Sequence, residues 1–304
     1  MSITKYIKEI GRGKDGARHL SREQAADLFG QLLDGTVTDL EVGAFCLAMR
    51  IKGETPAEMA GFLDATRQHL CTIATQGCPA VVLPSYNGAR KLPVLTALLA
   101  LLLARQGMAV VVHGSASEDT RISTQNVLLD LGIPAQTAIT KIAVGEVQFV
   151  PTALLSPGLA RLLDVRRVVG LRNSAHSLVK LLNPCDGPAV IVGSYTHPEY
   201  AVSMLETLKL THASALLLRG TEGEPVADAR RTPAMDAICC GNCTRVQEAQ
   251  SGSLTQLPDL PALDAASTAR WIQDMLAGLR PVPAPIAQQV EQTLHLSSQM
   301  RMTP

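Results

Sequence analysis

The sequence predicts an α/β protein with a small N-terminal helical domain, residues 1–75, and a large α/β domain, residues 76–304, built on a mostly parallel sheet. Three observations predict it. Apolar residues recur at helical spacing up to about residue 70, and from about residue 80 short Val/Leu-rich runs alternate with longer helical segments. Apolar residues make up 46% of the 304 residues but aromatic residues only 3%, so we expect a large aliphatic core.

Three capped helices are expected in the helical domain. Ser21 and Gln24 have the spacing of a capping box, in which a cap hydroxyl and a side chain three residues later each bond a backbone N–H. Thr38 caps the next helix, and Thr55 precedes a third helix that has Pro56 at its first position. A further helix with its turn is expected before them.

Five buried strands separated by helices are expected in the α/β domain. The strands are predicted at 81–83, 108–113, 148–151, 189–194 and 214–218, and the helices at 93–105, 122–131, 157–164, 174–182 and 198–208. Residues 222–262 read as irregular, followed by helices at 265–278 and 286–296. Ligands of such sheets bind beyond the carboxyl ends of the strands, so the turns at 84–88, 113–117, 194–197 and 219–224 should converge.

The segment from Val81 to Ala104 predicts an anion site. A buried strand leads through a turn and a basic pair, Arg90 and Lys91, into an apolar helix expected to begin near Pro93. The N-terminus of a helix has free N–H groups and a partial positive charge, which favour a phosphate. The phosphate belongs either to a small metabolite or to a nucleic-acid backbone.

Charge and composition limit the partners. The 27 basic and 27 acidic residues balance, so a basic surface must be local; one candidate is residues 1–22, with six basic and two acidic residues, and the alternative is a solvated helix. No signal peptide or membrane-spanning run is apparent, so we expect a soluble cytoplasmic protein with no membrane partner. Cys239, Cys240 and Cys243 lack a second ligand pair, so we expect free thiols, with no metal and no cofactor.

Several motifs, in order along the chain, carry a family resemblance. They are Leu-Glu-Val-Gly-Ala-Phe at 40–45, Arg-Ile-Lys-Gly-Glu-Thr at 50–55, Val-His-Gly at 112–114, the segment from Arg172 to Asn183-Pro184, and Gly-Thr-Glu-Gly-Glu at 220–224. Together they resemble the anthranilate phosphoribosyltransferase family, which is similar in fold to the pyrimidine nucleoside phosphorylases. The resemblance implies this fold and, for an active member, transfer of a phosphoribosyl group from phosphoribosyl pyrophosphate.

The sequence departs from that family where it binds the magnesium–pyrophosphate group. The family's Gly-Thr-Gly-Gly-Asp loop falls on residues 83–87, where all three glycines are missing and Tyr86 adds a ring. The positions of the family's Asp-Glu pair are occupied here by Gly223 and Glu224, so one of the two carboxylates is missing. Because a phosphate-binding backbone needs glycine and magnesium needs carboxylates, we expect a vestigial cleft without catalytic residues, made of Ser85, Tyr86, Asn87, Gly88, His113, Gly114 and Glu224.

The remaining pattern resembles a non-enzymatic branch of the family, described as binding nucleic acid with little sequence preference and pairing as a homodimer through the helical domain. The resemblance therefore implies a DNA-binding, possibly RNA-binding, homodimer. The cations expected to contact phosphates are Arg90, Lys91, Arg121, Arg166, Arg167, Arg172, Lys180, Lys8, Arg12 and Lys14.

Other interpretations remain open at this stage. Tyr86 either stacks on a base or fills the former pyrophosphate hollow, and Arg166 and Arg167 either meet phosphates or pair with acids such as Asp164. His113 is expected to be a loop or core histidine, not a catalytic base. The alternative functions are a glycosyl or phosphoribosyl transferase with another substrate and an interaction scaffold using its helical domain.

Overall fold

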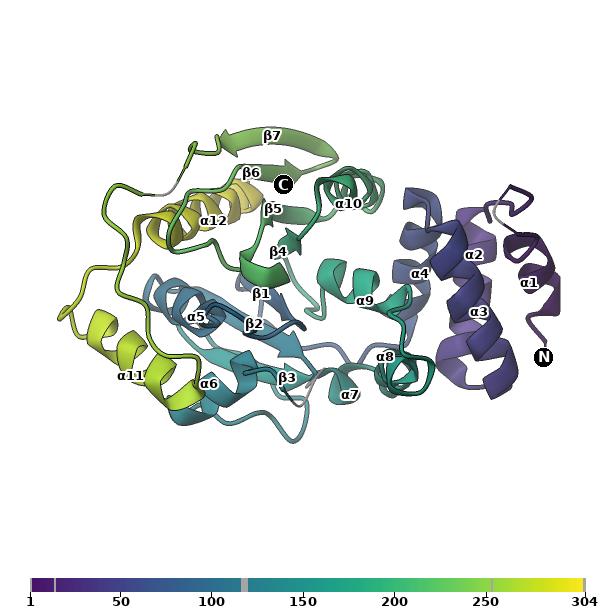
Figure 1. Ribbon diagram of the computed structural model, residues 1–304, viewed down its shortest axis with the longest axis horizontal. Helices are drawn as coiled ribbons and strands as arrows, with labels where there is room; N and C mark the ends of the chain where they lie inside the picture. The colour runs from purple at the N-terminus through teal and green to yellow at the C-terminus, as the bar shows by residue number, and fades with distance from the viewer. Residues whose placement is uncertain (1, 14, 116–119, 253, 303–304) are drawn as a thin grey trace.

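The computed structural model describes residues 2–13, 15–115, 120–252 and 254–302. A helical bundle lies at one end and a sheet covered by helices on both faces lies at the other (Figure 1). This is the predicted arrangement of a helical unit and a mostly parallel α/β unit. No helix in these ranges is both long enough and apolar enough to span a bilayer.

The bundle begins with α1 (Thr4–Ile10), α2 (Arg22–Asp34), α3 (Asp39–Lys52) and α4 (Pro56–Gln68). Ser21, Thr38 and Thr55 each form the full capping box, so all three predicted helix starts are confirmed. Stacked rings of Phe29 and Phe62, 4.6 Å between centroids, lie at its centre.

Later segments complete the bundle. After β3 (Val147–Pro151) the chain forms α7 (Thr152–Leu155), α8 (Pro157–Val169) and α9 (Ala175–Leu178), which continues as the 3₁₀ turn η1 (Val179–Leu181). Leu159, Leu162 and Leu163 of α8 are buried in the same apolar cluster as Phe29 and Leu32 of α2. The bundle is therefore built from two separate parts of the chain.

The sheet has seven strands in the order β3-β2-β1-β4-β5-β6-β7. β1 (Ala80–Ser85), β2 (Ala109–Gly114), β3, β4 (Ala189–Tyr195) and β5 (Ser214–Arg219) are parallel, as predicted. Alternate residues face opposite layers, because side chains alternate along a strand: Val81 and Leu83 lie in one core cluster and Ala80 and Val82 in another.

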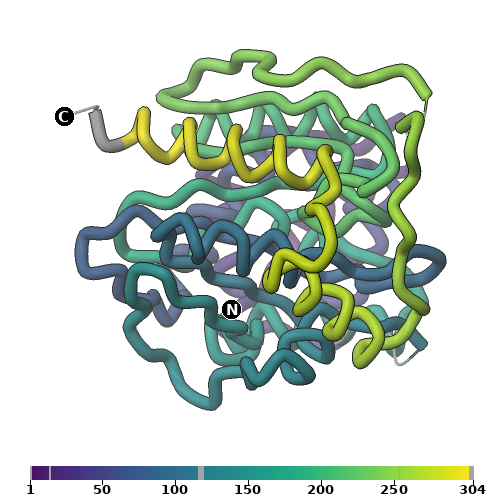
Figure 2. Tube along the Cα trace, turned by 90° about the vertical axis from the view of Figure 1, so that its left-hand side faces the viewer, coloured from purple at the N-terminus to yellow at the C-terminus, as the bar shows by residue number. Residues whose placement is uncertain are grey.

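Helices cover both faces of the sheet. One face carries α5 (Thr96–Arg105), α6 (Thr124–Asp130), α11 (Ala265–Leu276) and α12 (Ala284–Met302). In Figure 2 the yellow α12 and the blue α5 lie in front of the strands, and the purple bundle lies behind them. The other face carries α10 (Pro198–Leu210), which packs against α4 and so joins the sheet to the bundle.

Two sequence expectations were wrong. Residues 222–262 are not wholly irregular, because β6 (Met235–Cys239) and β7 (Asn242–Gln247) form an antiparallel hairpin. Its two turn residues, Cys240 and Gly241, both have positive φ, 52° and 77°, which fits a type I′ turn, but cysteine is not a usual residue for one. The second error concerns α5, which begins at Thr96 and not near Pro93, so Arg90 and Lys91 do not stand at a helix N-terminus.

Candidate functional site at the carboxyl edge of the sheet

The turns at the carboxyl ends of β1, β2, β4 and β5 converge, as the sequence predicts; residues 116–117 of the second turn lie outside the described residues. The Tyr86 hydroxyl lies 2.7 Å from His113 Nδ1, which joins the first two turns. The Ser194 hydroxyl donates to the Gly223 carbonyl at 2.8 Å, which joins the last two. We name residues 85–92 the amide loop and residues 220–224 the acidic loop.

The inner half of the amide loop binds Glu224, whose side chain is only 1% exposed. The backbone N–H groups of Asn87 and Gly88 donate to Glu224 Oε1 at 2.7 and 2.8 Å. Its Oε2 accepts bonds from the hydroxyls of Ser85, Thr96 (3.0 Å) and Thr124 (3.3 Å). Five donors therefore surround one buried carboxylate, which offsets the cost of removing its charge from water.

The outer half of the amide loop binds Glu222. The N–H of Arg90 donates to Glu222 Oε2 at 2.7 Å, that of Lys91 lies 3.1 Å from both oxygens, and that of Leu92 lies 3.3 Å from Oε2. Three successive N–H groups directed at one anion form an anion-binding concavity. A carboxylate of the protein itself occupies it.

Tyr86 fills the interior beside the amide loop. Its side chain is buried, and its hydroxyl also lies 2.9 Å from the Thr152 hydroxyl. Burial raises the pKa of Tyr86 and lowers that of His113 to about 3, because burial disfavours both charged forms. Both groups are therefore neutral at physiological pH, and with 6% of its surface exposed Tyr86 does not present a ring for stacking on a base.

Three predicted cations hold the loops in place. Arg121 Nη1 donates to the Asn87 carbonyl at 3.1 Å, and Arg172 Nη2 to the Asn87 side-chain oxygen at 3.3 Å. Lys180 Nζ donates to the carbonyls of Gly223 at 3.1 Å and Ser194 at 3.3 Å. Burial lowers the pKa of Lys180 to about 8, and its ammonium group bonds the backbone of the acidic loop.

The other predicted cations lie at the mouth of the site, at the end of α8 and near the N-terminus. Arg90 and Lys91 have exposed side chains at the mouth of the site. Arg166 and Arg167 are in the last turn of α8, where Arg167 pairs with Asp164 at 3.3 Å between exposed side chains. Burial, reinforced by the charges of Arg172 and Arg166, lowers the pKa of His176 to about 4.

The N-terminal cations are separate from this site. Lys8 and Arg12 are exposed on α1 and the turn after it, and Arg12 pairs with Glu9 at 2.9 Å. In Figure 1, α1 is on the outer side of the bundle, with the other bundle helices between it and the sheet. Within one chain, Lys8 and Arg12 therefore do not join the cations at the sheet edge; Lys14 lies outside the described residues.

A cleft of about 350 Å³ opens between the bundle and the carboxyl edge of the sheet. Arg50 of α3 and Glu54, just after α3, line it on one side. His176 of α9, Lys180 of η1 and Arg172, between α8 and α9, line it as well. Sequence reasoning did not select Arg50 or Glu222. Glu222 could have been selected, because it lies in the motif at 220–224, which is also one of the turns expected to converge. The only sequence feature that marks Arg50 is its position in the motif at 50–55.

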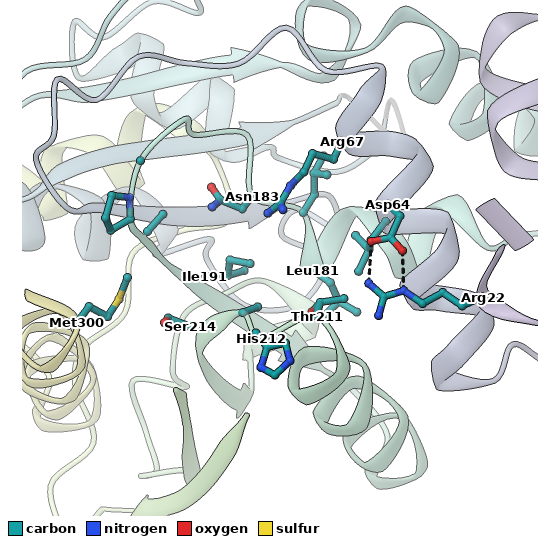
Figure 3. Close-up of a pocket in the computed structure, with 16 residues that line it drawn as sticks. Arg22, Asp64, Arg67, Leu181, Asn183, Ile191, Thr211, His212, Ser214 and Met300 are labelled. Carbon is teal, nitrogen blue, oxygen red and sulfur yellow. Dashed lines mark hydrogen bonds and ion pairs between the residues drawn. The ribbon is translucent and has the colours of Figure 1, made fainter. Parts of the chain in front are cut away.

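A second hollow, of about 260 Å³, lies at the amino ends of β4 and β5 (Figure 3). The ion pair of Arg22 and Asp64, 2.6 Å from Nε to Oδ2, stands at one side, and His212 and Met300 line other parts of the wall. Of the predicted phosphate-contacting cations that the structure describes, none lines this hollow. The cysteines at 239, 240 and 243 are free and lie on the hairpin, and no group of three or more metal-binding side chains occurs in the described ranges.

Comparison with known proteins identifies the family. Over 291 residues, 93% of this chain and 90% of the relative, the chain is 40% identical to the uncharacterized protein YbiB of Escherichia coli (strain K12). The chain belongs to the YbiB family. Residues 4–70 also match the helical bundle domain of the glycosyl transferase family, which agrees with the predicted anthranilate phosphoribosyltransferase-like fold.

More distant relatives of this YbiB family member are transferases. The anthranilate phosphoribosyltransferase of Idiomarina loihiensis is 28% identical over 284 residues, 85% of this chain and 79% of the relative. The crystal structure of the same enzyme from Thermus thermophilus matches with a TM-score of 0.74 at 22% identity, covering 97% of this chain and 89% of that one. A Saccharomyces cerevisiae structure of the enzyme in complex with PRPP and Mg matches with a TM-score of 0.71 at 13% identity, covering 97% and 88%. These similarities confirm the predicted fold.

Proposed function

We propose that this YbiB family member binds nucleic acid, DNA or RNA, through the phosphate backbone and has lost phosphoribosyl pyrophosphate binding. One observation carries the proposal: the N–H groups of the amide loop are bonded to Glu222 and Glu224, while the side chains of Arg90 and Lys91 beside them are exposed. A phosphate approaching the loop meets cationic side chains at the surface and not a free recess. This arrangement suits an extended polyanion, whose binding is electrostatic and little dependent on sequence.

The residues present do not fit a magnesium–pyrophosphate group. Such a group needs carboxylate oxygens for the metal and open N–H groups for the phosphates. Here Glu222 and Glu224 are bonded to the N–H groups themselves, and the Tyr86 ring is buried beside them. These contacts support the loss of phosphoribosyl pyrophosphate binding, and we expect no phosphoribosyl transfer.

We also propose that the chain forms a homodimer through the bundle. Leu40, Leu47 and Ile51 of α3 are 84%, 47% and 59% exposed, and their spacing puts them along one side of the helix. An exposed apolar face of this kind favours burial against a partner, and the similarity to a dimeric branch points to a second copy. Two copies double the phosphate contacts and raise avidity, and Lys8 and Arg12 on the bundle then extend the basic surface.

The location proposed is the cytoplasm. All seven cysteines are free thiols, two of them buried in the core, and free thiols persist in a reducing compartment. Both DNA and RNA occur in the cytoplasm of a bacterium such as the one that carries the 40% identical relative, so the proposed location and the proposed ligand agree.

Fluorescence anisotropy with labelled single-stranded and duplex oligonucleotides across a salt series tests the binding proposal. We expect affinity that falls steeply with salt and varies little between sequences. In Arg90→Ala/Lys91→Ala the slope of log K against log salt should decrease by about 0.9 for each duplex phosphate that the variant no longer neutralises.

The matched control is Lys141→Ala/Arg270→Ala, which removes two exposed cations before β3 and on α11. It changes the net charge equally but should keep the wild-type slope. No binding by the wild type at low salt contradicts the proposed function, and equal slopes for the two double variants contradict the assigned surface.

A further inference from the structure

The acidic loop occupies both halves of the amide loop at once. Glu224 bonds the N–H groups of residues 87 and 88, and Glu222 bonds those of residues 90, 91 and 92. Five backbone donors within six residues thus point at two carboxylates from one five-residue segment. Backbone donors in this density bind oxyanions, and here the oxyanions belong to the chain.

Further contacts fix the acidic loop in this position. Lys180 and Ser194 both donate to the Gly223 carbonyl, at 3.1 and 2.8 Å. Asn87 Nδ2 donates to the Glu222 carbonyl at 2.8 Å, and Thr221 N donates to the Val226 carbonyl at 2.8 Å. The loop is therefore anchored at its middle and at its base.

The backbone of the loop takes an unfavourable conformation to make these contacts. Glu222 has a φ of 52°, a left-handed conformation that is unfavourable for a non-glycine residue. Such a residue persists only where its surroundings compensate. The three N–H bonds to the Glu222 carboxylate are the compensating contacts in this structure.

We propose that the acidic loop is a built-in substitute for a phosphate ligand: Glu222 and Glu224 occupy an oxyanion site of the amide loop and exclude inorganic phosphate and pyrophosphate. The proposal rests on the loss of phosphoribosyl pyrophosphate binding proposed above, and it names the residues responsible. Glu222 closes the outer part, where the site meets solvent, and Glu224 closes the buried part. Removing Glu222 leaves the N–H groups of residues 90, 91 and 92 without this acceptor, in a segment where the side chains of Arg90 and Lys91 are exposed.

The test is pyrophosphate binding by Glu222→Gly, measured by isothermal titration calorimetry in a buffer without phosphate or divalent metal. Glycine removes the carboxylate and accepts the positive φ of this position, so the fold should be retained, as circular dichroism and thermal melting will show. We expect pyrophosphate to bind Glu222→Gly at least about tenfold more tightly than the wild type, since one charge-assisted hydrogen bond suffices for such a difference.

Two further variants sharpen the result. Glu199→Ala removes an exposed carboxylate in the first turn of α10, so it changes the net charge equally and should bind no more pyrophosphate than the wild type. Glu222→Asp shortens the side chain by one methylene and should give intermediate affinity; it also provides the measurement if the glycine variant does not fold.

The outcomes separate this proposal from the proposed function. A folded Glu222→Gly or Glu222→Asp that binds pyrophosphate no better than wild type overturns the proposal. The proposal is also overturned if Glu199→Ala binds pyrophosphate as tightly as Glu222→Gly does. Pyrophosphate binding by Glu222→Gly in a protein that shows no oligonucleotide binding supports the acidic loop as the substitute ligand and contradicts the nucleic-acid function.

Discussion

The inner half of the amide loop, residues 85–88, and the outer half, residues 90–92, differ although each bonds one carboxylate of the acidic loop. In the inner half the backbone, the Ser85 hydroxyl and the Tyr86 hydroxyl all bond to buried groups. In the outer half the backbone bonds Glu222, but the side chains of Arg90 and Lys91 extend into solvent. Within one loop, the backbone therefore bonds the acidic loop along its whole length, whereas only the outer half leaves side chains exposed for the nucleic-acid contacts that we propose.

The largest expected effect is at the buried end of this comparison. Glu224→Ala leaves two N–H groups and three hydroxyls without their acceptor, and it leaves the buried Lys180 ammonium without its nearby carboxylate. We expect the free energy of unfolding to fall by about 3–5 kcal/mol, measured by urea denaturation. Glu199→Ala, at an exposed position, should stay within about 0.5 kcal/mol of wild type, and a loss below about 1 kcal/mol at Glu224 would contradict the inner-half interpretation.

A smaller effect is expected where the acidic loop touches Asn87. A Cβ on Gly223 would lie 1.9 Å from Asn87 Nδ2, and Gly223 has a φ of 86°. Gly132 has a similar φ of 83° but no atom within 4 Å of the added Cβ. Gly223→Ala should therefore lose about 2–4 kcal/mol, by crowding and backbone strain together, whereas Gly132→Ala should lose only about 1 kcal/mol; equal losses would show that the loops are not in tight contact.

An effect of about 2 kcal/mol is expected from pH. The folded-state pKa of His113, about 3, lies below its ordinary value, so between roughly pH 6.5 and pH 3 the unfolded chain binds the proton that the folded chain excludes. Stability should therefore fall as the pH falls from 7 to 5, by about 2 kcal/mol for this group. Denaturation at a series of pH values should show a shallower slope in His113→Gln but not in His295→Gln, which changes an exposed histidine.

The smallest effect on stability is expected in the outer half. The side chains of Arg90 and Lys91 are exposed, and the backbone bonds to Glu222 do not depend on side-chain identity. Arg90→Ala/Lys91→Ala should change the free energy of unfolding by no more than about 0.5 kcal/mol while it weakens oligonucleotide binding. A large loss of stability in this variant would contradict the interpretation that the side chains of the outer half of the amide loop contribute little to stability.

Some of the site was predictable from sequence, because it depends on chain order and strand direction. The common direction of the parallel strands is enough to put the turns of Tyr86, His113 and Gly223 at one edge of the sheet. The side chain of Lys180 was not predictable in this way: it was expected at the surface, but it bonds two carbonyls in the interior. The sequence does not distinguish a lysine or arginine that contacts a phosphate from one that bonds a backbone carbonyl oxygen.

The sequence by itself determined most of the helices, the five parallel strands and the family resemblance. Capping residues at Ser21, Thr38 and Thr55 and the alternation of apolar runs act over a few residues, so the linear order contains them. The tertiary structure alone decided which anion occupies the amide loop. Glu222 bonds the N–H of Arg90 across 132 positions of the chain, and a contact of that range depends on how the sheet brings its turns together, which no local pattern specifies.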